Sequence, residues 1–495
     1  MLYNKGNHAQ LKRVQPQPSR LQGENGGKIY STWNPGMTKI KIITHLPSKE
    51  EMMKHMKAGQ QTTLILSVLL VLTLLGTACT PRLSPPELTA TVAAAYTPTP
   101  MPSPTPAAIT PDQDLAALIQ SAADGEVLTL APGTFSLAKG LLIDKNLTLM
   151  GSDSGQTILT AAEPAEGVKA MVVNTANTTL TLQNLGINYS GSTPSAVLFI
   201  KAGSLVMDNC TLSGATLSES GNQLGLLSVE NESTALVRHS RFIGNPEKAD
   251  PKSPEKVPGG IFVSGNAHLT LEDSLIDGSY IGVYAYGSSV VTLTHNEINN
   301  TYAAAAYLEE ASGEVTANTL QWSTGVQLGL FGNAKVTASE NIFNNADGTN
   351  AIQVNGTAVA TLLNNTLNGG AAGIVFGDNS TGQAVNNHIT LASGSGIFVN
   401  KEAAPTLDSN LIESCEIGIL YQDNAAGSAV NNTIFFGNIG LSIKSPASPS
   451  IAGNTIQGYL VALASDPEDW ITKIDAHDNS LTDGEPEIII TEKEE

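Results

Sequence analysis

Short apolar segments alternate with polar, glycine-containing turns through residues 113–490 of this chain. Around Ile397 and Val399, for example, the apolar side chains alternate with Phe398 and Asn400. A period of two is typical of a strand and not of a helix. The pattern therefore predicts a series of short strands separated by turns, with at least two strands in each repeating unit.

The repeating unit is about 22 residues long, and an asparagine marks it. A second series, in phase with the first, places a glycine before a β-branched residue or leucine at Gly373, Gly396, Gly418 and Gly440. Nine asparagines, each followed two places later by an apolar residue, recur at intervals of 22 to 25 residues: Asn296, Asn318, Asn341, Asn365, Asn387, Asn410, Asn432, Asn454 and Asn479. So regular a series predicts a solenoid.

Two solenoids have coils of this size, the leucine-rich repeat and the parallel β-helix. A leucine-rich repeat needs an apolar residue eight places before its asparagine, where this chain has polar residues. These are Ser288, Asn379, Glu402 and Asn424. The parallel β-helix is therefore the better fit.

In a parallel β-helix, equivalent residues of successive coils stack about 4.8 Å apart. Each buried asparagine can then exchange amide hydrogen bonds with the asparagines above and below it. We expect such an internal ladder from Asn296 to Asn479, in which Asn365→Ala would cost about 1–3 kcal/mol. We expect the glycine series to permit the tight turn before each strand.

Residues 113–490 resemble the right-handed parallel β-helix family of pectin-lyase-like proteins. The segment DLAALIQSAADGEVLTLAPGTF is similar to the usual start of that fold, a short helix, a strand and then Pro-Gly-Thr. Thr110, Pro111 and Gln113 supply an N-cap, a proline at the first helical position and a capping-box partner, which predicts a helix from about 111 to 122. We expect an all-β, single-stranded right-handed parallel β-helix solenoid over 111–490, with a short N-terminal capping helix.

The residues before the solenoid have the composition of a targeting signal. Leu64–Leu75 is a twelve-residue apolar run preceded by Lys54 and Lys57, and it is too short to span a bilayer. With the following Gly-Thr-Ala-Cys it resembles a bacterial lipoprotein signal peptide. The resemblance implies a signal at 53–78 and lipidation of Cys79; the alternative is a helix that stays in the membrane as an anchor.

Residues 79–110 are rich in proline and threonine, which favours an extended stalk. Residues 1–52 look unlike a targeting signal and are interpreted as an over-extended, disordered start, and 491–495 as an acidic tail. We therefore expect an extracytoplasmic protein of a bacterial cell envelope, held to the membrane through a lipid anchor at Cys79.

Charge and cysteine content exclude two classes of ligand. The net charge of −20 would repel nucleic acid and other polyanions, so no nucleic-acid partner is expected. Cys210 and Cys415 lie far apart without a C-x-x-C spacing, which predicts buried free thiols and no metal site. No cofactor is certain, although Ca²⁺ could bridge the acidic surface to a charged ligand.

The resemblance implies a polysaccharide ligand, bound in a groove along the outer face of one sheet. On the sheet that begins at the glycine series, the outward positions carry aromatic rings and amides, which suit stacking on sugar rings and hydrogen bonding to their hydroxyls. The candidate substrate-binding residues are Phe262, Tyr284, Tyr286, Gln353, Asn355, Phe398 and Asn400. The alternative is that Phe262, Tyr284 and Tyr286 only pack under the loop at residues 244–260. The same loop would lie at the level of His239, Asp273 and His295 and could act as a lid there.

That face has no pair of carboxylates for a glycosidase and no acid cluster with a basic residue for a lyase. One polar cluster could be catalytic. When the coils are aligned, His239, Asp273 and His295 stack in one column, where they could share protons. Arg238 and Glu272 lie one place earlier in the same coils. The alternative is an ordinary cross-strand charge ladder.

Another acidic cluster consists of Glu309, Glu310 and Glu314, and we interpret it as a solvated turn. Three functions stay open: an envelope-tethered module that binds a cell-envelope glycan, a polysaccharide lyase or glycoside hydrolase, and a structural or NosD-like accessory protein. We favour the binding module without catalytic activity, and a ligand that is neutral, weakly charged or bound through Ca²⁺.

Overall fold

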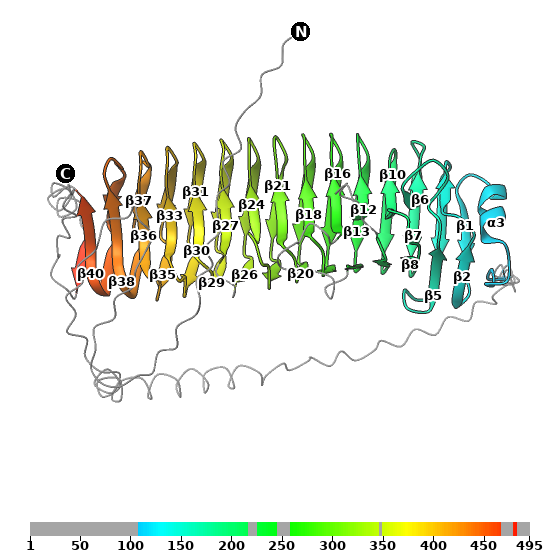
Figure 1. Cartoon of the computed structure of the whole chain (residues 1–495), viewed down its shortest axis with the longest axis horizontal. Coiled ribbons are helices and arrows are strands. Elements are labelled where there is room, and N and C mark those ends of the chain that lie inside the picture. The colour runs from blue at the N-terminus through cyan, green and yellow to red at the C-terminus, as the bar shows by residue number, and fades with distance from the viewer. Residues whose placement is uncertain (1–106, 216–224, 245–257, 346–348, 467–478, 483–495) are drawn as a thin grey trace, which may run out of the picture. The chain divides into compact units, whose positions relative to one another are not determined.

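The computed structural model describes residues 107–215, 225–244, 258–345, 349–466 and 479–482. In these residues one short helix is followed only by strands, and every strand pairing is parallel (Figure 1). The predicted start, the signal peptide with Cys79, the stalk up to residue 106 and the acidic tail lie outside the described residues.

Each coil contributes one strand to each of three faces, so the predicted right-handed parallel β-helix is confirmed. The first face is a 14-stranded sheet. Its strands are β1 (Glu126–Thr129), β4 (Leu147–Met150), β7 (Thr179–Gln183), β10 (Ser204–Asp208), β13 (Thr234–Arg238), β16 (His268–Glu272), β19 (Val290–Thr294), β22 (Ser312–Thr316), β25 (Lys335–Ser339), β28 (Val359–Leu363), β31 (Thr381–Val385), β34 (Ala404–Asp408), β37 (Ser428–Val430) and β39 (Ser450–Ala452).

The second face follows the first in each coil. Its strands are β2 (Gly133–Leu137), β5 (Thr157–Ala161), β8 (Gly186–Tyr189), β11 (Thr211–Ser213), β14 (Arg241–Ile243), β17 (Leu275–Asp277), β20 (Glu297–Asn299), β23 (Thr319–Gln321), β26 (Ile342–Asn345), β29 (Thr366–Gly369), β32 (His388–Thr390), β35 (Leu411–Glu413) and β41 (Ser480–Thr482).

The third face completes each coil. Its strands are β3 (Leu141–Ile143), β6 (Ala170–Asn174), β9 (Ala196–Ile200), β12 (Gly225–Val229), β15 (Gly259–Val263), β18 (Ile281–Ala285), β21 (Ala303–Tyr307), β24 (Leu328–Leu330), β27 (Asn350–Val354), β30 (Ala372–Phe376), β33 (Ser395–Val399) and β36 (Ile417–Tyr421). Two longer strands run through both the second and third faces: β38 (Thr433–Lys444) and β40 (Thr455–Asp466).

The capping helix is shorter than predicted. Helix α3 spans Leu115–Ser121, and its N-cap is Asp114, which accepts a hydrogen bond from the Ala117 amide. Thr110 and Gln113 do hydrogen bond to each other, but their bond closes the turn that precedes the helix. Because Leu115 and Ile119 are buried in the core, α3 covers the end of the solenoid at β1 (Figure 1).

The asparagine ladder lies inside the coils, at the turn between the first and second faces, as predicted. From Asn296 to Asn454 each ladder asparagine is at most 2% exposed. Each of these side-chain oxygens accepts a hydrogen bond from the backbone amide of the equivalent residue in the preceding coil. The side chains also bond to one another, as where the Nδ2 of Asn341 donates to the Oδ1 of Asn365 at 2.9 Å. The Ser274 and Ser240 hydroxyls continue the column toward Cys210. The repeat therefore satisfies buried backbone groups coil by coil.

The glycine series has a different role from the one predicted. Gly373, Gly396, Gly418 and Gly440 lie inside third-face strands, and none has a left-handed φ angle. A Cβ on Gly418 would lie 2.3 Å from the Ile434 Cγ2 and 2.4 Å from the Gly440 carbonyl oxygen. Glycine is needed there because adjacent coils and the second face pack closely against it, and not because the backbone turns.

Cys210 and Cys415 are both free thiols and are 1% exposed, as predicted. Burial raises the pKa of Cys210 to about 12 and the pKa of Cys415 to about 11. The thiolate is the reactive form, and at about pH 8 neither folded thiol forms it appreciably.

We therefore expect iodoacetamide to leave both thiols unmodified in the folded protein at about pH 8 and to alkylate both after unfolding. Peptide mapping by mass spectrometry distinguishes them from Cys79. Alkylation of either thiol in the folded protein would contradict their burial.

Candidate functional site

The outward side chains of the third face form two rows along the solenoid. The strands pair in register, so Phe199, Ser228, Phe262 and Tyr284 follow one another in successive coils. Two places further along each strand, Lys201, Glu230, Ser264 and Tyr286 form the second row, because successive backbone hydrogen bonds join these coils in the same register.

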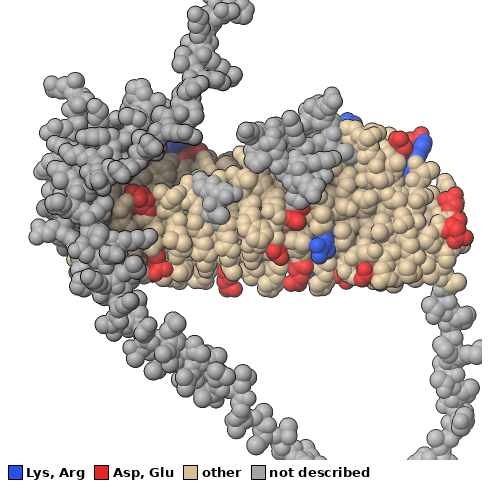
Figure 2. Space-filling model, turned by 60° about the horizontal axis from the view of Figure 1, so that its bottom comes forward, with Lys and Arg blue, Asp and Glu red and all other residues tan. Residues whose placement is uncertain are grey.

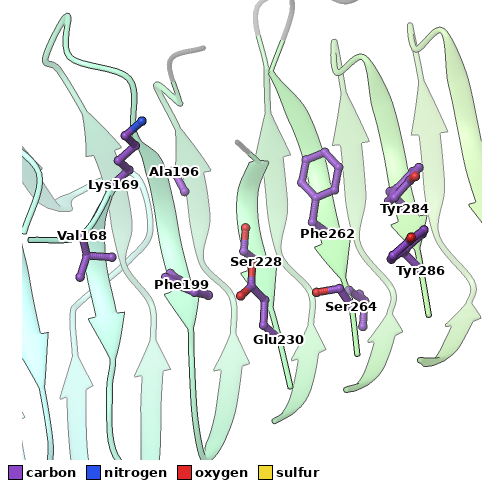
Figure 3. Close-up of a pocket in the computed structure, with 11 residues that line it drawn as sticks. Val168, Lys169, Ala196, Phe199, Ser228, Glu230, Phe262, Ser264, Tyr284 and Tyr286 are labelled. Carbon is purple, nitrogen blue, oxygen red and sulfur yellow. The ribbon is translucent and has the colours of Figure 1, made fainter. Parts of the chain in front are cut away.

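These two rows border an open groove of about 270 Å³, which we call the aromatic groove (Figure 3). It extends across the coils of β6, β9, β12, β15 and β18. Its lining residues are Val168, Lys169, Ala196, Phe199, Ser228, Glu230, Phe262, Val263, Ser264, Tyr284 and Tyr286.

Three aromatic rings lie together at one end of the groove. The ring centroids of Phe262 and Tyr284 are 5.5 Å apart, with the planes tilted by 57°. The rings of Tyr284 and Tyr286 are 6.2 Å apart and nearly parallel, at 13°. Tyr286 is 42% exposed, so its ring is available to a ligand. The predicted contact of these rings with the loop falls mainly on residues 245–257, which lie outside the described residues.

Two carboxylates accompany the rings. Glu230 is half-buried, and burial raises the pKa of its carboxyl, an effect that Lys201 partly opposes. The second carboxylate is that of Glu309. It accepts a hydrogen bond from the Tyr286 hydroxyl, which raises the pKa of that tyrosine. The pKa of Tyr284 is raised chiefly by burial and further by the charge of Glu309. Glu309 therefore lies beside both tyrosines, whereas the sequence indicated only a solvated turn.

The sequence-based selection missed part of the groove. It began at Phe262 and did not include Phe199, Ser228, Glu230 or Lys169. The same alternation of inward and outward positions, followed back through β12 and β9, places Phe199 and Glu230 on the outer side. The signal was weaker there because these strands do not follow the glycine series that set the register further along the chain.

The other predicted binding residues lie on the same face but outside the groove. Gln353 is three coils beyond Tyr284, and Phe398 is two coils further. Asn355 and Asn400 lie on either side of Gly377, where a Cβ would come within 2.8 and 2.9 Å of their side-chain oxygens. These amides form a separate polar strip of the third face.

The predicted catalytic cluster is divided into pairs. His239 Nδ1 lies 2.7 Å from the Asp208 carboxylate, and Arg238 Nε lies 2.6 Å from Glu272. His295 Nδ1 and Asp273 are 3.9 Å apart. His239, Asp273 and His295 all have left-handed φ angles between 47° and 55° and form the exposed turn after the first face.

His239 therefore contacts Asp208, at the strand end of the preceding coil, and not Asp273, whereas His295 is paired with Asp273, the turn residue of the coil before it. Within the described part of the chain, no group of three or more histidine, cysteine or acidic side chains is placed to hold a metal ion. The arrangement is that of separate side-chain pairs at the surface, of which Arg238 and Glu272 form an ion pair, and it resembles the charge ladder more than a shared proton site.

The visible surface carries more acidic than basic side chains (Figure 2), in line with the net charge of −20. No helix in the described ranges is long and apolar enough to cross a membrane.

A family model described as "Right handed beta helix region" matches residues 170–321 and 304–456. No curated protein matches the chain. Among solved structures, the periplasmic alginate epimerase AlgG is 12% identical, with a TM-score of 0.46 over 70% of this chain and 83% of that one.

Two further structures are similar to comparable extents. The catalytic unit of a GH87 α-1,3-glucanase from Streptomyces thermodiastaticus is 13% identical, with a TM-score of 0.36 over 77% of this chain and 69% of that one. The A-module of the Azotobacter vinelandii mannuronan C-5 epimerase AlgE6 is 14% identical, with a TM-score of 0.36 over 76% of this chain and 94% of that one. What this chain binds must therefore follow from its own side chains.

Proposed function

The chain belongs to the right-handed β-helix family, and from that premise we propose that it is an envelope-tethered, extracytoplasmic lipoprotein that binds a polysaccharide on its third face. The observation that carries the proposal is the aromatic groove, where Phe262, Tyr284 and Tyr286 lie in contact beside hydroxyl and carboxyl groups. Rings offer their faces to the apolar faces of sugars, and the polar groups can bond to sugar hydroxyls.

The size of the groove supports weak binding of single chains. Each stacked ring contributes on the order of 1 kcal/mol, so three rings with a few hydrogen bonds suggest a Kd of roughly millimolar to high micromolar. Copies tethered to one membrane can compensate through avidity on a polymer. The amides of Gln353, Asn355 and Asn400, with Phe398, offer further contacts to a polysaccharide that continues along the face.

A polysaccharide lyase or glycoside hydrolase is the second candidate. The observation that favours it is Glu230, a half-buried carboxyl with a raised pKa that lines the groove, since perturbed carboxyls are frequent in acid–base catalysis. The exposed pairs His239–Asp208 and His295–Asp273 are the other place where proton transfer could occur.

A glycan array combined with an assay for released reducing sugar tests the proposal on the full chain. We expect binding to at least one envelope glycan without sugar release. If reducing sugar is released and Asp273→Asn stops the release, the enzyme replaces the binding module. If no glycan binds, the proposal is wrong.

Tethering has a separate test. Cys79→Ser removes the residue that would be acylated, so we expect the variant to leave the membrane fraction, while the unchanged protein stays with it and incorporates labelled fatty acid. Cell fractionation with immunoblotting measures this. A Cys79→Ser protein that is still membrane-bound and unprocessed would show that residues 64–75 are an ordinary membrane anchor.

A further inference from the structure

Charge is distributed unevenly along the aromatic groove. Lys169 precedes β6, and Lys201 follows β9. Lys169 lies four coils from the tyrosines of β18, which is about 19 Å at 4.8 Å per coil. Figure 3 shows it at the opposite end of the groove from Tyr284 and Tyr286. Both lysines are therefore remote from Tyr284 and Tyr286, although Lys201 lies one coil from Glu230 and its charge acts on that carboxyl.

At the aromatic end the described charged groups are acidic. Glu230 stands two coils before Tyr286 in the same row, with only Ser264 between them. Glu309 contacts Tyr286 from the other side. The rings of Phe262, Tyr284 and Tyr286 consequently lie between two carboxylates.

This arrangement is suited to a cation. The face of an aromatic ring attracts an ammonium group, and the attraction grows when the site is partly desolvated. Glu230 lines the groove and is half-buried, and the charge of Lys201 only partly opposes the rise in its pKa. A cationic ligand would add opposite charge on the side of Glu230 that faces the tyrosines. The net charge of −20 adds a long-range attraction for polycations.

We infer that the aromatic groove takes a glycan with free amino groups, a polymer of deacetylated hexosamine, whose ammonium groups lie against Tyr284 and Tyr286 between Glu230 and Glu309. This inference rests on the proposed glycan-binding function and specifies its ligand. A neutral sugar would use the rings but neither carboxylate charge, and a polyuronate would be repelled by both.

Two hexasaccharides with the same linkage test the inference, one of glucosamine and one of N-acetylglucosamine. Each is titrated calorimetrically into the full chain at a pH at which the amines are protonated and Glu230 is ionised. We expect the glucosamine hexamer to bind about tenfold more tightly, a preference that one or two cation–ring and ion-pair contacts can supply. The preference should shrink between about 0.05 and 0.5 M salt as the charges are screened.

The variant Glu230→Gln keeps the size of the side chain and removes its charge. We expect it to reduce the preference for the glucosamine hexamer about fivefold, with little change in the affinity for the acetylated hexamer. Glu314→Gln is the matched control, because Glu314 is an exposed carboxylate of β22 on the first face; it should leave the preference unchanged. Circular dichroism checks that both variants are folded.

The possible failures are distinguishable. If the acetylated hexamer binds as tightly as the glucosamine hexamer, or if Glu230→Gln and Glu314→Gln behave alike, the cationic ligand is wrong and glycan binding stands. If neither hexamer binds but a neutral glycan on the array does, the cationic ligand is wrong and the proposed glycan binding stands. If no glycan binds, both are overturned.

Discussion

Asn365→Ala is expected to lower the free energy of unfolding by about 3 kcal/mol. The Asn365 Oδ1 accepts from the backbone amide and the side-chain amide of Asn341, at 3.0 and 2.9 Å. Its Nδ2 donates to the Ala338 carbonyl oxygen and to the Asn387 Oδ1, both at 2.9 Å. Alanine would leave the Asn341 backbone amide without a partner in a fully buried position, and it would remove the second donor to the Ala338 carbonyl. A buried group left unpaired costs about 1–3 kcal/mol.

Urea unfolding followed by circular dichroism measures this loss. A solenoid need not unfold in one step, so amide hydrogen exchange in β25, β28 and β31 provides a local measurement. Asn379→Ala is the control, since Asn379 is an exposed asparagine in the turn before β31, and it should change stability by less than about 0.5 kcal/mol. Equal effects of the two variants would mean that the ladder does not stabilise the coils.

The variant with both Tyr284→Ala and Tyr286→Ala should lose detectable glycan binding while keeping its fold. Two stacked rings contribute about 2 kcal/mol, which is about 30-fold in affinity and moves a high-micromolar Kd out of range. Both rings are on the outer side of β18 and its following turn. Their loss leaves the core inside the coils intact and removes the contact of Tyr284 with the small outer cluster of Ile281, Ala303 and Ala306.

Titration of the double variant with the strongest ligand from the array measures the effect. Phe436→Ala is a suitable control, because Phe436 is also an exposed aromatic residue, 60% exposed in β38. If the tyrosine variant binds as before, or if the control loses as much affinity, the aromatic groove is not the glycan-binding site.

The sequence was most informative where one physical requirement recurs in every coil. Buried amides must be paired, so the asparagine column was visible from Asn296 to Asn479 and fixed the coil length, the parallel pairing and the inward side of each strand. The glycine series was equally visible, but the sequence did not show why glycine is required at these positions. The close contact between Gly418, Ile434 and Gly440 joins residues of three different strands, and only the packed structure shows it.

The groove and the ion pairs depended on geometry that periodicity does not determine. The stacking of coils correctly placed Tyr284 and Tyr286 on one face. The sequence did not indicate that Glu230 lines the same groove or that Glu309 accepts a hydrogen bond from Tyr286, and only the structure shows these positions. Likewise, His239 was expected to meet Asp273 because their columns align. His239 instead contacts Asp208 in the preceding coil, and Asp273 is paired with His295.

A crystal structure of the full chain with the strongest array ligand tests the central claim most directly. We expect sugar density in the aromatic groove, with one ring parallel to Tyr284 or Tyr286 and polar contacts to Glu230 or Ser264. Ligand density at the His239–Asp208 and His295–Asp273 pairs, or on another face with the groove empty, would contradict it.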